Sequence, residues 1–345
     1  MSIKYAAYKG FFELVWASQL THLIRALSRA RGVIFTMHRV IPGAPADFSP
    51  NAILQITPQY LEYVIVRVRE LGLDIVSMDE AVTRIKTPEP GNKFVVLSFD
   101  DAYRDNLEYA LPVLKRQNCP FILYVPTAFV DGVGAVWWQA LEDVIASQEA
   151  IAYLDDNDET VYADTKTLSQ KYSVYSKLYW RMRNLPEDRR VKFVQEFTGG
   201  YGLDMEEHCR ELIMTWKQLK TFVDEPLCTI GVHTVHHYEL AKLEERQARE
   251  EIELSIQVIN SQFGFEPVHL SYPIGREKSA GPREYEMARQ IGLASAVTTR
   301  PGAIYYRHKD QLTSLPRISL NGRFQERRYV EVLATGAIFS MFSGT

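Results

Sequence analysis

Short runs of β-branched and aromatic residues alternate with stretches of helical periodicity along most of this chain. Strands that are separated by helices pair in parallel through right-handed crossovers, because a tight turn cannot join parallel strands. The chain therefore predicts an α/β fold, a distorted (β/α) barrel that is closed or nearly closed. Its seven candidate strands are residues 33–37, 75–77, 94–99, 121–125, 229–232, 268–271 and 294–298.

The segments between these runs carry helix signals. Thr57 precedes Pro58, a pair typical of an N-cap and a first helical position, and apolar residues follow at helical spacing up to Leu71. Asp105 is likewise placed to cap the helix that follows it.

One connection is far longer than the others. Residues 133–226 separate the fourth and fifth candidate strands, and an unstructured loop of that length would be unusual in a compact domain. Because the segment contains helix-compatible stretches, we predict a helical insertion. It belongs to one domain of residues 31–325, between an N-terminal helical segment (1–30) and a C-terminal tail (326–345).

The composition is that of a soluble globular protein, with 46% hydrophobic and 24% charged residues. The net charge of -4 does not favour binding to nucleic acid. Basic residues cluster locally, but acidic neighbours interrupt them, so we interpret this cluster as a solvated helix face. Its members are Arg181, Arg183, Arg189 and Arg190.

Three scattered cysteines, Cys119, Cys209 and Cys228, do not suggest a disulfide framework. The first 30 residues lack the continuous apolar stretch of a signal peptide, and residues 330–342 are too short to span a bilayer. We therefore expect a cytoplasmic location without an integral membrane span. An apolar stripe between Phe11 and Leu20 either anchors at a membrane surface or packs on the domain.

Two adjacent carboxylates, Asp100 and Asp101, follow directly after the candidate strand 94–99. In a barrel of parallel strands the carboxyl ends face the active site, so these residues can supply a metal ligand and a base. The alternative is that one of them only caps the next helix, a role that Asp105 already suits.

Two histidines, His233 and His237, follow the candidate strand 229–232. They can converge on one ion if the chain turns helically after the strand. Together with Asp101 they offer two nitrogens and one oxygen, which leaves a coordination position open for water and substrate. His236 lies between them and should point elsewhere.

These segments resemble the NodB-homology polysaccharide deacetylases. The sequence S-F-D-D-A at 98–102 resembles the family's T-F-D-D-G motif, with Ala102 where Gly is usual, and H-T-V-H-H at 233–237 resembles its H-[ST]-x-x-H motif. The sequence V-H-L-S-Y-P-I-G-R at 268–276 resembles the third motif, in the version that ends in aromatic-Pro-x-Gly. The resemblance covers roughly residues 33–320 apart from the insertion.

The resemblance implies roles for single residues. Asp100 would be the general base, while Asp101, His233 and His237 would bind a divalent metal ion, usually zinc. Thr234 would orient the ligand loop. A free carboxylate beside a bound divalent ion suits this chemistry, because the base can take a proton from an activated water.

The third motif would contribute the oxyanion site. Tyr272 and Pro273 lead into a loop in which the Ile274 N–H is expected to stabilise the tetrahedral oxyanion. Ser271 stands where an Arg often orients the base in the family. Arg276 is a candidate for the missing guanidinium, and the alternative is that it is a surface residue.

The general acid that protonates the leaving amine has two candidates. His38 ends the first candidate strand in M-H, which resembles the M-Y-H start of family members that act on poly-N-acetylglucosamine-type chains. His308, in a charged late loop, is the rival, and we favour His38 because a strand end lies on the correct face. Trp137 and Trp138 open the insertion, where Trp138 either stacks on a sugar ring or belongs to a buried pair.

We therefore expect a metal-dependent hydrolase of linear amide bonds, which removes acetyl groups from N-acetylhexosamine units of an oligo- or polysaccharide. One alternative is a saccharide-binding module with the same fold and lost turnover. Another is a deacylase that acts on a different amide, such as a formyl group. The complete set of base and ligands favours the enzyme.

Overall fold

The computed structural model describes residues 13, 28–155, 157, 159–323 and 325–336, and the structural statements below concern these residues. The predicted N-terminal segment, with its stripe between Phe11 and Leu20, lies almost entirely outside them. Within the described ranges, no helix is both long and apolar enough to cross a bilayer.

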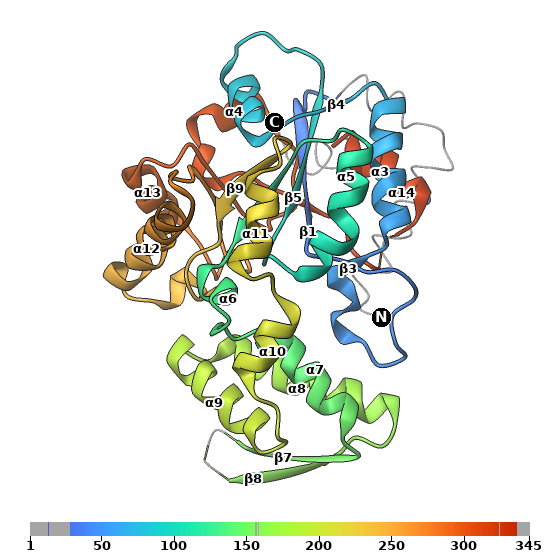
Figure 1. The fold of residues 1–345 in the computed structure, drawn as a ribbon, viewed down its shortest axis with the longest axis vertical. Coiled ribbons are helices and arrows are strands. Elements are labelled where there is room, and N and C mark those ends of the chain that lie inside the picture. The colour runs from blue at the N-terminus through green and yellow to red at the C-terminus, as the bar shows by residue number, and fades with distance from the viewer. Residues whose placement is uncertain (1–12, 14–27, 156, 158, 324, 337–345) are drawn as a thin grey trace.

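Eight strands form one curved parallel sheet at the centre of the barrel half of the molecule (Figure 1). Seven follow the order β11-β10-β9-β6-β5-β1-β12, and β4 pairs with the first half of β5. One parallel bridge, between Val297 and Leu315, joins the two ends of this order. The bounds are β1 (Gly32–Met37), β4 (Asp74–Ile75), β5 (Phe94–Phe99), β6 (Phe121–Val125), β9 (Cys228–Val232), β10 (His269–Ser271), β11 (Ser295–Val297) and β12 (Ile318–Ser319). The distorted (β/α) barrel predicted from the sequence is confirmed.

Each of the seven predicted runs overlaps a strand, although the run 75–77 shares only Ile75 with β4, and the sequence did not predict β12. This strand has only two residues and pairs with β1 at Phe35 and Thr36. So short a segment has no periodicity of its own, although it carries Arg317 into the barrel. A second small pairing, of β2 (Arg39–Val40) with β3 (Gln55–Ile56), lies just after β1.

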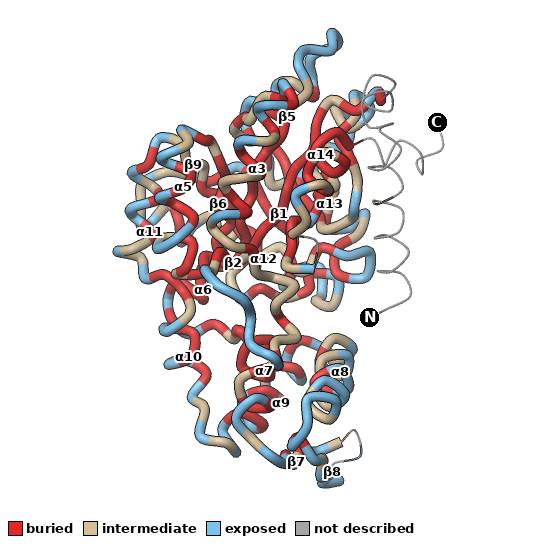
Figure 2. The backbone as a smooth tube through the Cα atoms, turned by 90° about the vertical axis from the view of Figure 1, so that its right-hand side faces the viewer, coloured by how far each residue is buried: buried red, intermediate tan, exposed pale blue. Residues whose placement is uncertain are grey.

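Most residues of the barrel strands are buried (Figure 2). One face packs against the surrounding helices, and the other lines the barrel interior with side chains such as Ile34, Val96 and Tyr124. The amino ends of the strands are closed by α4 (Met78–Lys86), which inserts Met78 among these side chains. At the carboxyl ends the interior is polar, and the candidate site lies at this end of the barrel.

Helices cover the outside of the barrel. They are α3 (Pro58–Glu70), α5 (Leu111–Arg116), α6 (Thr127–Val130), α12 (Glu245–Phe263), α13 (Pro282–Ile291) and α14 (Arg327–Ala334). Thr57 caps α3 as predicted. Because α14 packs against α3, residues 327–334 belong to the domain and not to a tail.

The predicted capping role of Asp105 is wrong. Its carboxylate accepts hydrogen bonds from Arg39 Nε and the Val40 N–H, both at 2.8 Å, and α5 is preceded by a π-helical turn, Asn106–Ala110. A cation from β2 provides a stronger partner than a helix N–H group.

The insertion lies beyond the carboxyl ends of the strands, in the lower half of Figure 1. Its helices there are α7 (Trp137–Ser147), α8 (Leu168–Asn184), α9 (Glu187–Gly199) and α10 (Met205–Leu212), whereas α11 (Trp216–Val223) returns to the barrel and packs beside β9. It also contains an antiparallel hairpin of β7 (Ala150–Leu154) and β8 (Thr160–Asp164), so the prediction of a helical insertion was incomplete.

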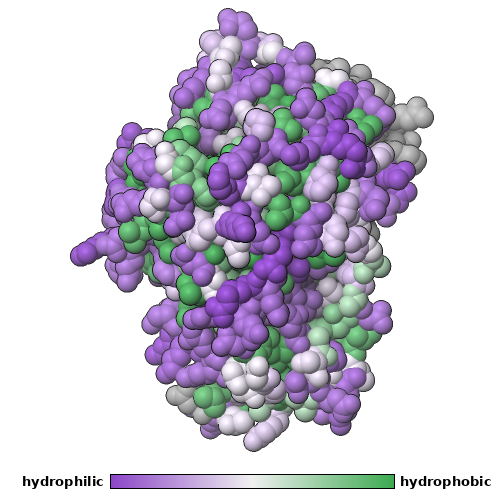
Figure 3. Space-filling view, viewed as in Figure 1, coloured by the Kyte–Doolittle hydropathy of each residue, from purple (hydrophilic) through white to green (hydrophobic). Residues whose placement is uncertain are grey.

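The face drawn in Figure 3 is mainly hydrophilic, with hydrophobic side chains in small patches. The predicted solvated face of the arginine cluster is, however, partly wrong. Arg190 is 2% exposed and contacts Glu187, and Arg183 pairs with Glu239 from outside the insertion. The sequence showed the local acidic neighbours but not this distant carboxylate.

We predict that Gly231→Ala destabilises the barrel. A Cβ at this position in β9 would lie 2.6 Å from the Tyr124 ring and 2.9 Å from the His269 carbonyl oxygen. Overpacking of this kind costs about 1–3 kcal/mol, which urea unfolding would measure. Gly199→Ala is the control, since no atom lies within 4 Å of its added Cβ. Equal stability of the two variants would contradict the packing of Tyr124 against β9.

Candidate metal centre

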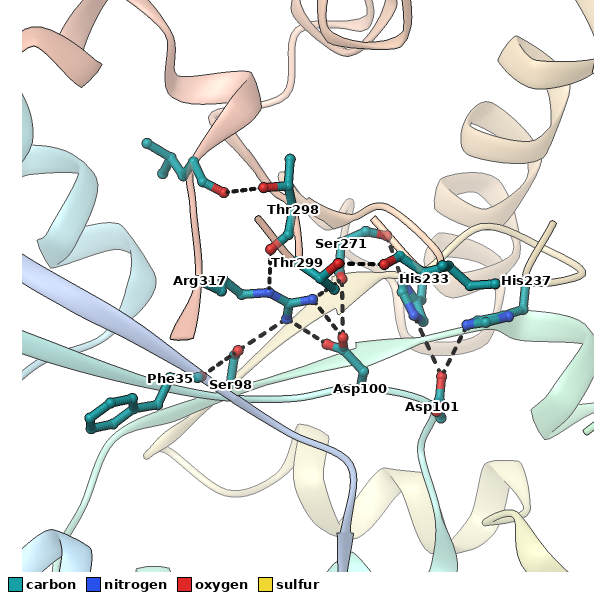
Figure 4. A network of polar contacts seen from close by, with 12 residues as sticks. Phe35, Ser98, Asp100, Asp101, His233, His237, Ser271, Thr298, Thr299 and Arg317 are labelled. Atoms are coloured by element: carbon teal, nitrogen blue, oxygen red, sulfur yellow. Dashed lines mark hydrogen bonds and ion pairs between the residues drawn. The ribbon is translucent and has the colours of Figure 1, made fainter. Parts of the chain in front are cut away.

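The three predicted metal ligands meet at the carboxyl ends of β5 and β9. Asp101 Oδ1 lies 3.5 Å from His233 Nε2 and 3.4 Å from His237 Nε2. All three side chains are buried, and Figure 4 shows both imidazoles directed at the carboxylate of Asp101. The arrangement is compact enough for one ion.

The donor set fits a divalent cation. Two ligand atoms bound at about 2.1 Å to a tetrahedral zinc ion are about 3.4 Å apart, close to the observed spacings. Among the described residues, the buried Asp101 Oδ1 has no hydrogen-bond partner, so a cation would satisfy it. His233 Nδ1 donates to the Ser271 carbonyl oxygen at 2.6 Å, which leaves Nε2 with a free lone pair. Two imidazoles and one carboxylate suit zinc and related metals.

A left-handed backbone brings the ligands together. Thr234 and His237 have φ of 64° and 59°, and the chain after β9 forms a loop. The helical turn on which the sequence made this convergence conditional is not formed, and a loop brings His233 and His237 together instead. Thr234 Oγ1 accepts the His237 N–H at 3.1 Å, which is the orienting contact that the family resemblance implied.

The first motif has the same backbone feature. Asp101 and Ala102 have φ of 74° and 55°, so the chain turns sharply at the end of β5. Ala102 thus occupies the conformation for which Gly is the usual residue, and it remains there because the surrounding structure is fully packed.

His236 points away from the site, as predicted. Its Nδ1 lies 2.6 Å from Glu251 Oε1, and this hydrogen bond raises the pKa of His236. Glu251, on α12, also accepts the N–H groups of Val235 and His236.

Asp100 lies beside the three ligand residues and is paired with Arg317. The guanidinium donates to both carboxylate oxygens, at 2.8 and 2.6 Å, and also to Ser271 Oγ at 2.9 Å (Figure 4). Burial alone would raise the pKa of Asp100, but Arg317 and then His233 outweigh it and hold that pKa well below its ordinary value. Asp100 is therefore ionised at neutral pH and fixed in orientation.

Asp101 and His237 are in the states that metal binding requires. Burial would raise the pKa of Asp101, but His233 and His237 lower it further, so this carboxylate is ionised. Burial lowers the pKa of His237 to about 3, so its imidazole is neutral. Deprotonated ligands are needed before an ion can bind.

Arg317 was missed by the sequence analysis, which offered Arg276 instead. Arg276 is exposed, whereas Arg317 is 1% exposed inside the barrel. Arg317 precedes the two-residue β12 and follows no motif. The one available signal was a single cation within the otherwise uncharged run L-P-R-I-S-L at 315–320.

The third motif is placed as expected at the end of β10, but its tyrosine is turned away from the site. Tyr272 is buried, and its hydroxyl donates to the Thr313 carbonyl oxygen at 2.9 Å. Tyr272, which the third motif suggested as a supporting or substrate-contacting residue of the site, thus directs its hydroxyl away from the candidate metal ligands. Pro273 is also buried, and Ile274 adopts φ of 61° while its carbonyl oxygen accepts Thr299 Oγ1 at 2.5 Å.

The two candidate acids lie at opposite ends of the barrel. His38 follows β1 directly, and the Asp100 N–H donates to the Met37 carbonyl oxygen at 3.0 Å, so His38 is at the edge that carries the site. His308 follows Ile304, which pairs with Gly32 at the start of β1. Burial lowers the pKa of His308 to about 4, and its Nδ1 accepts the Tyr305 N–H.

Trp138 belongs to a buried pair with Trp137 and does not form an open platform for a sugar. Its Nε1 donates to the Tyr103 hydroxyl at 2.8 Å, and its ring centroid is 5.0 Å from that of His237. The stacking interpretation is thus wrong, and Trp138 instead packs against a metal-ligand candidate.

Comparison with known proteins gives one family and several similar folds. The sequence model of the family described as "Polysaccharide deacetylase" matches residues 87–294. This match includes Asp100 and the three ligand candidates, whereas His38 and Arg317 lie outside it. No curated protein matches the chain significantly.

Three solved structures illustrate the shared fold. The deacetylase PplD of Streptococcus pyogenes, in complex with acetate, is 16% identical with a TM-score of 0.57, over 88% of this chain and 99% of its own. IcaB from Ammonifex degensii is 17% identical with a TM-score of 0.54, over 88% of this chain and 98% of IcaB. The deacetylase domain of BpsB from Bordetella bronchiseptica is 16% identical with a TM-score of 0.50, over 83% and 94%.

The ion pair of Asp100 with Arg317 predicts a pH-dependent stability. Because the folded pKa of Asp100 is lowered, its contribution is fully present above about pH 4 and is lost as the pH falls through the folded pKa. In Arg317→Met, burial instead raises the pKa of the unpaired carboxyl, so this variant gains stability as the pH falls. We expect it to be about 3–5 kcal/mol less stable than the parent at pH 7, with a smaller difference at pH 4.5.

Urea unfolding of metal-free protein at both pH values measures this difference. Arg276→Met is the matched control, because Arg276 is exposed, and it should stay within about 0.5 kcal/mol of the parent. If Arg317→Met matched this control at pH 7, the ion pair would not be part of the structure.

Proposed function

This chain belongs to the polysaccharide deacetylase family, and we propose that it is a metal-dependent hydrolase that removes acetyl groups from N-acetylhexosamine units of an oligo- or polysaccharide. The observation that carries the proposal is the meeting of Asp101, His233 and His237 beside a second, ionised carboxylate, Asp100. A binding site alone needs no base next to its metal ligands.

In this proposal Asp101, His233 and His237 hold the ion, and the donor set of two imidazoles and one carboxylate favours Zn²⁺. A bound divalent ion lowers the pKa of water and polarises the amide carbonyl. Asp100 accepts the proton of the attacking water while the new C–O bond forms. The ion pair with Arg317 lowers the pKa of Asp100 and so makes this carboxylate a weaker base. The fixed position of Asp100 must compensate for this loss of basicity.

The remaining steps use residues at the same edge of the barrel. The Ile274 N–H donates to the oxyanion of the tetrahedral intermediate. His38 gives a proton to the amide nitrogen as the C–N bond breaks, and acetate and the free amine leave. Its position after β1, on the same edge as Asp100, supports this role.

The two alternative functions differ in measurable ways. A saccharide-binding module without turnover would bind glycans and release no acid. A deacylase for another amide would release formate from N-formyl sugars faster than acetate from N-acetyl sugars. The retained base, ligands and loop favour hydrolysis over binding alone.

The direct test is acid release from a panel of N-acetylated and N-formylated glycans, before and after chelation. We expect acetate release that stops when the metal is removed and returns with added zinc or cobalt. A metal-free protein that is as active as the untreated one would sink the proposal. Formate release without acetate release would transfer it to the formyl alternative.

The neighbouring carboxylates should have different variant phenotypes. Asp100→Asn should retain the metal and lose about 10²- to 10⁴-fold in kcat, since it removes the base. Asp101→Asn should weaken metal binding, because it replaces a ligand. Metal content and kcat, measured on the same preparations, separate the two roles. Reversed phenotypes would mean that the two roles are exchanged.

His38→Ala should lower kcat on an N-acetyl sugar by roughly 10²-fold with unchanged metal content, because an amide nitrogen leaves only when protonated. The loss should be smaller on an activated acetate ester, whose leaving group needs no proton. His308→Ala is the control and should affect both substrates little, since His308 lies at the other end of the barrel. A His38→Ala defect of equal size on amide and ester would exclude an acid role.

A further inference from the structure

The loop of residues 233–239, which presents His237, has a strained backbone. Thr234 and His237 are both left-handed, and each such residue costs about 1–2 kcal/mol. Strain of this kind persists only where surrounding contacts over-determine the conformation. The loop should therefore have firm anchors on both sides of His237.

The anchors before His237 come from the barrel's own helices. Glu251 of α12 accepts the N–H groups of Val235 and His236, at 3.1 and 2.9 Å. The carbonyl oxygen of Thr234 accepts the Thr127 N–H of α6 at 3.2 Å. These contacts fix the first half of the loop.

The anchor after His237 is Glu239, whose side chain is 1% exposed. Its Oε2 accepts Ser279 Oγ at 2.7 Å and lies 3.2 Å from Arg183 Nη2. Its Oε1 lies 2.8 Å from Lys242 Nζ and 3.7 Å from Arg190 Nη1. Every described partner of this carboxylate is thus a donor or a cation.

Much of this anchor belongs to the insertion. Arg183 is near the end of α8 and Arg190 lies in α9, as does Glu187, whose Oε1 accepts the Glu239 N–H at 3.1 Å. The Arg190 guanidinium also lies 5.4 Å from the centroid of the Trp137 ring. We refer to Arg183, Glu187, Arg190, Glu239, Lys242 and Ser279 as the Glu239 cluster.

We propose that the Glu239 cluster makes the insertion a positioning element of the metal centre. Arg183 and Arg190 fix Glu239, and Glu239 fixes the backbone that presents His237 two residues earlier. Ser279 extends the same cluster to the loop after the third motif. The inference rests on the proposed metal site, and it predicts that substitutions in the insertion weaken metal binding without touching a ligand.

A double-mutant cycle on metal affinity tests this inference. Arg190→Gln and Glu239→Gln should each weaken zinc binding by about 10-fold, the size of effect that partners of ligand residues usually have. The loss of zinc affinity in the double variant should be smaller than the product of the two single losses, because both substitutions act through one contact. Competition of folded protein with a chromophoric chelator measures the affinity. The visible absorption of bound cobalt, which reports ligand geometry, should change in the same variants.

Glu225→Gln is the matched control. Glu225 is a buried carboxylate paired with Lys115 at 2.8 Å, and it lies just before the start of β9, at the other end of that strand from His233. The control should lose stability and retain the zinc affinity and the cobalt spectrum of the parent. A loss of affinity as large as that of Arg190→Gln would show general destabilisation and overturn the proposal.

Ser279→Ala covers the case in which the charge variants fail to fold, because it removes one hydrogen bond and no charge. It should weaken zinc binding severalfold. A parent protein that binds no zinc or cobalt would contradict the proposed function itself. A parent that binds zinc, together with Arg190→Gln or Ser279→Ala variants of unchanged affinity, would overturn only the role of the Glu239 cluster.

Discussion

Buried charge is the constraint on which this site depends. Asp100 and Asp101 are both 1% exposed at the end of one strand, and an ionised carboxylate in such a place needs a cation beside it. Arg317 meets that need for Asp100. Asp101 faces two imidazoles, and burial keeps that of His237 neutral. A bound metal ion would therefore balance the negative charge that remains on Asp101.

The fold brings together side chains from distant parts of the chain to surround these carboxylates. The barrel interior is apolar where α4 closes it and polar at the other end, where Ser98, Ser271 and Arg317 surround Asp100. The sheet order brings β12 beside β1, and this is how Arg317, near the end of the domain, reaches Asp100. The insertion contributes in turn to the loop that presents His237.

Sequence alone predicted the features whose signal is local. The runs that form β5 and β6 are continuous and apolar, so their bounds were predicted to the residue. The carboxylates and histidines directly follow strands, and the family resemblance gave each of them a proposed role. Features decided by tertiary partners were missed or wrongly predicted: Arg317 just before a two-residue strand, the Arg39 partner of Asp105, the buried Arg190, and the left-handed loop between His233 and His237.

The central claim, an ion held by one carboxylate and two imidazoles, is tested most directly by X-ray absorption at the zinc edge of the zinc-loaded protein. The account predicts only nitrogen and oxygen scatterers at about 2.0–2.2 Å, with the outer scattering of two imidazoles. It also predicts one imidazole fewer in His237→Ala. A sulfur scatterer at about 2.3 Å, or a spectrum that His237→Ala leaves unchanged, would contradict it.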